Sequence, residues 1–159
     1  MVKADLYFLS LLLKNYKGHS IRFHLSNSSD FVGTVGDLSK DNGLIELIDV
    51  SVGKRFIPLC DIVALESTNS LPIVLPHRSR KCYVEVDTNL GSCSRALNIK
   101  AFELWRSQTN VSIFVIGHNV TNTRILDVVP GIISANNSVF VAAHVAELQV
   151  PNVNPTVPV

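Results

Sequence analysis

The sequence is poor in charge and in cysteine. Charged side chains make up 17% of the 159 residues and the net charge is +1. The chain as a whole is therefore not an electrostatic binder of nucleic acid, and any such role requires a local basic patch. Cys60, Cys82 and Cys93 form no CxxC pair, which argues against a zinc ribbon or a disulfide framework. Cys82 and Cys93 could pair, but reduced, buried thiols are favoured.

Sequence patterns of enzymes and membrane proteins are also missing. The chain has no glycine-rich phosphate loop, no dinucleotide fingerprint and no nucleophile elbow, and its carboxylates show no catalytic spacing. The apolar run over residues 6–13 is too short to span a bilayer, and it lacks a cleavage pattern. His19 and His24 have no partner at metal-ligand spacing. These absences predict a non-catalytic, cytoplasmic protein with no membrane partner, no metal and no cofactor.

What the sequence does contain is apolar. Hydrophobic residues make up 47%, enough for a core in one medium domain or two small ones. Residues 4–16 place leucines on one helical stripe. A period of two then predicts strands, over residues 21–25, 31–38, 44–50 and 55–65. Glycines at 33 and 36 predict bends, as does Pro58 in the last strand.

The same order of elements returns in the second half of the chain. Residues 95–107 show a helical pattern, and strands are predicted over residues 111–116, 123–129, 132–133 and 139–150. A repeated order of helix and strongly bent strands predicts an internal duplication. We divide the chain into a first domain (1–67), a linker with partial structure (68–94), a second domain (95–151) and a flexible tail (152–159). Within the linker, residues 83–86 are interpreted as a short strand.

The repeated unit resembles the Sm-like superfamily, and specifically its bacterial Hfq branch. Residues 110–117 are similar to the first strand of that branch, with the helix before it, and residues 141–151 resemble its final strand, which carries a histidine at the place of His144. In the first half, Gly33 matches the bend glycine of the second strand. Residues 41–47 resemble the third-strand motif, in which an aspartate opens the turn.

The resemblance implies a mostly β fold, with short helices and two strongly bent small barrels of five strands each. It also implies ring assembly, because Sm-like domains join through the edges of their fourth and fifth strands. Two halves in one chain could pair with each other first. A homo-oligomeric ring would then contain half as many chains as domains.

The RNA site of the family is incomplete in this chain. Its aromatic base-stacking residue is replaced by Gly43, and a lysine is replaced by Ala143; Leu59 is assigned to the histidine position of the first half. Two hypotheses follow. The protein is an RNA-binding Sm-like module, or it is a scaffolding ring that has lost RNA binding and acts through other proteins.

For RNA binding, the candidate residues include the basic cluster of Arg78, Arg80 and Lys81. His144 and Asn42 are the other two, at the positions where the resemblance places the final strand and the turn before the third strand. A solvated linker is the favoured alternative for the cluster, and a packed or surface role is the favoured alternative for a lone histidine.

Overall fold

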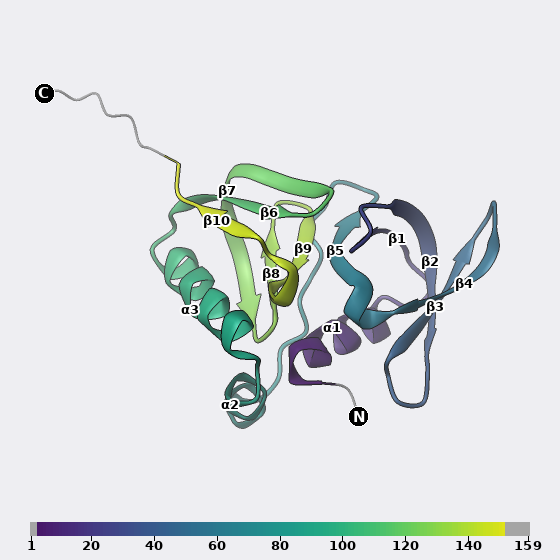
Figure 1. The fold of residues 1–159 in the computed structure, drawn as a ribbon, viewed down its shortest axis with the longest axis horizontal. Coiled ribbons are helices and arrows are strands. Elements are labelled where there is room, and N and C mark those ends of the chain that lie inside the picture. The colour runs from purple at the N-terminus through teal and green to yellow at the C-terminus, as the bar shows by residue number, and fades with distance from the viewer. Residues whose placement is uncertain (1–2, 152–159) are drawn as a thin grey trace, which may run out of the picture.

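The computed structural model describes residues 3–151, and the predicted tail at 152–159 lies outside them. The first half contains α1 (Ala4–Asn15), β1 (Ser20–Leu25), β2 (Asp30–Leu38), β3 (Leu44–Asp49), β4 (Gly53–Pro58), the 3-10 turn η1 (Leu59–Asp61) and β5 (Ile62–Ser67). The second contains α2 (Arg80–Thr88), α3 (Ser92–Arg106), β6 (Asn110–Val115), β7 (His118–Val129), β8 (Ile132–Ala135), β9 (Ser138–Val141), η2 (Ala142–His144) and β10 (Glu147–Gln149). The fold is mostly β with three α-helices (Figure 1).

All ten strands belong to one antiparallel sheet, in the order β10-β6-β7-β8-β9-β5-β1-β2-β3-β4. Read from β10, each half has the same internal order, in which the fifth strand pairs with the first and the second, third and fourth follow. Each half also has a 3-10 turn between its fourth and fifth strands. The order of elements that the sequence predicted to repeat is thus matched by a repeated strand order.

The two halves meet along one ladder between β5 and β9, which we call the seam. Ala64 pairs with Phe140, Leu65 with Val139 and Glu66 with Ser138. Because side chains alternate along a strand, Leu65 and Val139 enter the core under α1, whereas Ala64 and Phe140 enter the second core. The seam therefore divides two apolar clusters and contributes side chains to both.

The two strongly bent small barrels that the resemblance implies are not closed by these ladders. Within residues 3–151 the sheet is open, although each half is curved at its bends. A half would close only if β5 paired with another strand of that half on its second edge. Instead, β5 pairs with β1 on one edge and with β9 of the other half on the other. The predicted single last strands are also divided. Pro58, which cannot donate a ladder hydrogen bond, ends β4, and the chain makes a 3-10 turn before β5.

The linker is more ordered than expected, and its predicted strand at residues 83–86 is wrong. These residues lie in α2, where the Ser79 hydroxyl accepts a hydrogen bond from the Cys82 backbone amide and caps the helix. The predicted burial of the cysteines is also wrong: Cys60 and Cys93 are exposed, Cys82 is half-buried, and all three are free.

The predicted first helix is confirmed, and it fills the core of the first half. Phe8, Leu9, Leu12 and Leu13 are fully buried, because the apolar stripe of α1 packs against the curved sheet. The apolar run near the N-terminus is thus a core helix. Among the described residues, no helix has the length and apolarity that a bilayer crossing requires.

Candidate functional site

The sheet ends in two strands that pair on one side only within the described chain, β4 and β10. They lie at opposite ends of the long axis of the molecule (Figure 1). These edges are the same two kinds of strand that meet in the seam, because β4 is the fourth strand of the first half and β10 is the fifth strand of the second. An edge with free backbone amides and carbonyls is a template for pairing with another chain.

Exposure differs sharply between the covered strands and the bare ones. All four residues of β9 are buried, whereas β4 has no fully buried residue. Phe56 of β4 and Val139 of β9 are equivalent positions, because each lies three residues before the 3-10 turn of its half. Phe56 is 62% exposed, whereas Val139 is fully buried. Leu44 and Ile48 of β3 are also exposed, and the register of β3 with β4 puts them on the same face as Phe56; exposed apolar side chains grouped in this way are typical of an interaction surface.

The basic cluster Arg78, Arg80 and Lys81 lies at the start of α2, and all three residues are exposed. The Arg78 guanidinium donates to the His77 carbonyl at 3.0 Å, while Arg80 and Lys81 border a shallow hollow. Tyr83 is the nearest aromatic in sequence, but its ring packs 5.4 Å from that of Phe8. The fold thus keeps the three cations together, while the Tyr83 ring is partly buried against α1.

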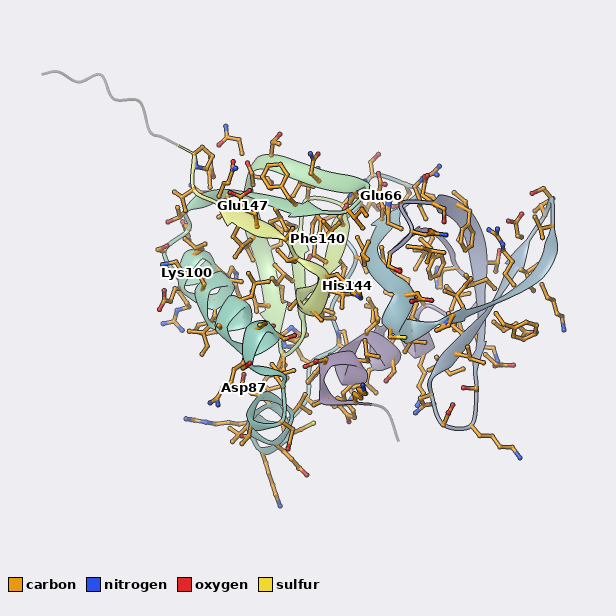
Figure 2. The ribbon with its side chains drawn as sticks, in the orientation of Figure 1. Glu66, Asp87, Lys100, Phe140, His144 and Glu147 are labelled. Carbon is orange, nitrogen blue, oxygen red and sulfur yellow. The ribbon has the colours of Figure 1, made fainter. Side chains whose placement is uncertain are left out.

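His144 and Asn42 lie in other parts of the fold. His144 ends η2, and its Nε2 lies 2.7 Å from the Cys60 carbonyl oxygen of η1, so it ties the two halves together (Figure 2). By the alignment of the two 3-10 turns, its counterpart in the first half is Asp61, not Leu59 as the sequence suggested. Asn42 forms the turn between β2 and β3 with φ of +59°. No contact joins the five predicted residues into one site within the described chain.

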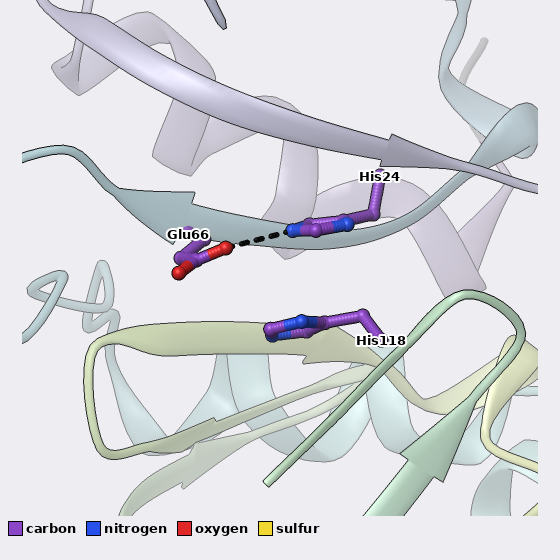
Figure 3. A group of neighbouring side chains, drawn as sticks. All are labelled: His24, Glu66 and His118. Atoms are coloured by element: carbon purple, nitrogen blue, oxygen red, sulfur yellow. Dashed lines mark hydrogen bonds and ion pairs between the residues drawn. The ribbon is translucent and has the colours of Figure 1, made fainter. Parts of the chain in front are cut away.

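A group of titratable side chains gathers at the seam instead. His24 of β1, Glu66 of β5 and His118 of β7 place their ligand-type atoms within 4.8 Å of one another (Figure 3). His24 Nε2 lies 2.9 Å from Glu66 Oε1, and the two imidazole rings stack with centroids 4.1 Å apart. His118 Nε2 also lies 2.9 Å from the hydroxyl of Ser138, which is fully buried.

The electrostatics of this group favour a neutral His118. Burial lowers the pKa of His118, and the adjacent His24 imidazole lowers it further, while the carboxylates of Glu66 and Asp30 act in the opposite direction. His24 is only 6% exposed, and Glu66 beside it is half-buried. A neutral imidazole keeps a free lone pair on one ring nitrogen, and the lowered pKa of His118 therefore leaves one available on this residue at neutral pH.

A separate hollow of about 680 Å³ lies between α2, α3 and the end of the β7–β8 hairpin. Val84, Ile99 and Phe102 give it mostly apolar walls. At its border, Tyr83 Oη is hydrogen-bonded to His77 Nδ1, and His77 Nε2 lies 2.6 Å from Asp127 Oδ2. This chain of hydrogen bonds fastens α2 to β7. Among the described residues, no serine or cysteine lines the hollow as a nucleophile.

Sequence reasoning missed the group at the seam because its members are far apart along the chain. His24 and Glu66 are separated by 42 residues, and His118 lies in the other half. Their proximity depends on the register in which Arg22 pairs with Glu66, which puts His24 and Glu66 at diagonal positions on one face. It depends equally on the seam, because the pairing of β9 with β5 places His118 of β7 beside His24 of β1. Residue spacing along the sequence predicts neither this register nor the pairing at the seam.

Comparison with known proteins gives no relative: no family model matches the chain, and no curated protein or solved structure matches it either.

Proposed function

We propose that the chain is a non-catalytic tandem Sm-like protein that assembles into a homo-oligomer, by pairing β10 of one copy with β4 of the next. The observation that carries the proposal is the seam, an antiparallel ladder between a fifth and a fourth strand. The same two kinds of strand end the sheet with their outer sides free in the described chain. The two halves have the same strand order, which supports the interpretation that each is a curved Sm-like unit.

The seam also supplies the expected register of the contact between copies. In each half the fifth strand pairs with the first. The pair of Ala64 with His24 in the first half corresponds to the pair of Glu147 with Phe114 in the second. Counted from the 3-10 turns, β4 corresponds to β9. The matching ladder would place Leu148 opposite Phe56 of the next copy, with the pairs Glu147–Ile57 and Gln149–Arg55 on either side.

Burial of Phe56 in that ladder would remove the largest exposed apolar side chain of β4 from water. Leu148, its expected partner, is already half-buried against the second core. Apolar surface removed from water contributes roughly 25 cal/mol per Å². A repeated head-to-tail contact of this kind closes a ring when its rotation allows, and otherwise extends as a filament.

The mass of the intact protein in solution tests this proposal. We expect the wild-type chain to have the mass of several copies by light scattering and native mass spectrometry. Phe56→Asp should reduce it to the mass of one chain, because the variant places a charge in the middle of the ladder. Val50→Asp is the matched control, since Val50 is fully exposed next to β3 but lies outside the expected ladder. A wild-type protein with the mass of one chain would refute edge pairing.

A second candidate function, RNA binding, is favoured by the exposed cations at the start of α2. Three cations near a helix N-terminus provide positive charge and free backbone amides for phosphate groups. If this surface binds RNA, affinity for short A-rich and U-rich RNA should fall steeply with salt.

Substitution of Arg78, Arg80 and Lys81 together by alanine should then weaken binding and reduce its salt dependence. The control is a triple alanine variant of the α3 cations Arg95, Lys100 and Arg106. Assembly without RNA binding at low salt would instead support a scaffold that acts through protein contacts.

A further inference from the structure

We propose that His24, Glu66 and His118 form a Zn²⁺ site inside the seam. The proposal is independent of the assembly of copies, because all three residues belong to one chain and meet across the β5–β9 junction. It also goes against the expectation from sequence spacing, which gave His24 no metal partner.

The donor set is one that zinc uses in proteins. Two imidazoles and one carboxylate give three protein ligands, and a water or another small ligand completes a tetrahedral shell. Zinc lies roughly 2.0–2.2 Å from such atoms, which places ligand atoms about 3.4 Å from one another. His24 Nε2 and Glu66 Oε1 are already 2.9 Å apart, and all three groups lie within 4.8 Å. The two rings are stacked nearly parallel, so zinc binding requires one imidazole to turn out of the stack until both lone pairs point to the ion.

The surroundings orient the two imidazoles. His118 stacks between His24 and Phe140, with ring centroids 4.1 Å and 5.6 Å away and interplanar angles of 17° and 15°. His118 Nε2 lies 2.9 Å from the buried Ser138 hydroxyl, and in the tautomer that donates from Nε2 the Nδ1 lone pair is the one left for a metal. Zinc-bound histidines are usually held in this way by a partner on the other ring nitrogen.

The site is partly enclosed, because His24 is buried while Glu66 and His118 are partly exposed. The side chain of Glu66 remains 27% exposed, which leaves a route from solvent. The carboxylate supplies negative charge that offsets part of the charge of the ion.

The group belongs to the seam and is absent from the outer edges. At the positions that match His24 and Glu66, the second half has Phe114 and Gln149, as the registers of β10 with β6 and of β5 with β1 show. A phenyl ring cannot bind zinc. The ion would therefore hold β1 and β5 to β7 within each chain, and would leave the contact between copies unchanged.

Calorimetric titration of the full chain tests the site. Protein stripped with EDTA and dialysed is titrated with Zn²⁺ in the presence of a competing chelator, and one ion per chain is expected. Glu66→Gln, His118→Ala and His24→Phe should each weaken binding at least tenfold, since even outer-shell changes cost roughly 10–100-fold. His24→Phe copies the residue of the second half. His19→Ala, which removes an exposed histidine outside the group, should bind as the wild type does.

Two further measurements keep the test decisive if a variant folds poorly. Thermal unfolding of each variant in EDTA shows whether it folds, and Co²⁺ bound to the wild-type chain should give the visible absorption of a tetrahedral nitrogen–oxygen site. A wild-type chain that binds neither ion, or three folded variants that bind zinc as tightly as the wild type, would overturn the proposal. The mass of the assembly should be the same in EDTA and in zinc, so a failure here leaves edge pairing untouched.

Discussion

The seam and the two outer edges contain the same kinds of strand in different surroundings. In the seam, a fourth and a fifth strand cover each other, and Phe140 and Val139 are fully buried between two cores. At the ends of the sheet, the corresponding strands β4 and β10 are bare, and Phe56 is 62% exposed. The comparison shows that repetition of a unit within one chain covers one pair of edges and leaves the other pair available.

The seam also holds a group of titratable side chains that has no counterpart at the outer edge formed by β10. His24 and Glu66 face His118 there, whereas the matching positions of β6 and β10 hold Phe114 and Gln149. The junction within a chain is permanent, so its polar groups always have partners from the other half. The outer edges have no such partners within the described chain.

The largest expected effect is on the free energy of unfolding, when one phenylalanine in each region is replaced by alanine. Phe140→Ala should lower the free energy of unfolding by about 3–5 kcal/mol, because it leaves a cavity beside the seam. Phe56→Ala should change the stability of a single chain by less than about 0.5 kcal/mol, while weakening assembly. Denaturant unfolding at low protein concentration measures both. Equal losses of stability would contradict the contrast between covered and bare strands.

A second test uses a glycine at a contact between the halves. Gly131 has φ of +91°, and a Cβ there would lie 2.7 Å from the Asp5 carbonyl oxygen of α1. Gly131→Ala should cost about 2–5 kcal/mol, from left-handed strain and overpacking together. Gly53 has φ of +106° with open space around it, so Gly53→Ala should cost only about 1–2 kcal/mol. Thermal unfolding compares the two, and a larger loss for Gly53→Ala would contradict the packed contact.

The helix α2 has no counterpart in the first half, and Tyr83 tests what it adds. Tyr83→Phe removes the hydroxyl that bonds to His77, which in turn bonds to Asp127 of β7. The hydroxyl also accepts a hydrogen bond from the Arg78 backbone amide, so the loss should be about 1–3 kcal/mol, as for two hydrogen bonds. Tyr7→Phe is the control, because its hydroxyl lies 3.9 Å from Cys82 Sγ and makes a weaker contact. Hydrogen exchange of the α2 amides should increase in the first variant, and unchanged exchange would count against this role.

The smallest expected effect is a change in how stability varies with pH. Because the pKa of His118 is lowered in the folded chain, the unfolded chain binds more protons, and stability should fall as pH drops from about 7.5 through the folded pKa. His118→Gln should flatten this part of the stability profile in EDTA, and His19→Ala should not. A profile that is equally steep in His118→Gln would assign the dependence to other groups.

Much of the local structure was predictable because it depends on neighbouring residues. The apolar stripe of α1 and the alternation in β1 each specify an element without reference to the rest of the chain. Residues 83–86 were misread because four alternating residues fit a strand as well as a helix, and the Ser79 cap decides for the helix. The predicted cluster of cations stayed together because its residues are adjacent, whereas His144 and Asn42 ended in separate regions.

The sequence by itself determined that this is a mostly β chain with a repeated order of elements, since periodicity and turn residues act over short distances. The family resemblance allowed the two halves to pair through a fourth and a fifth strand, but only the tertiary structure decided that β5 and β9 are the strands that meet, and that His24, Glu66 and His118 come together there. Strand pairing between halves depends on which edges are left free and on the burial of side chains such as Phe140. Those are properties of the assembled sheet, which no local pattern contains.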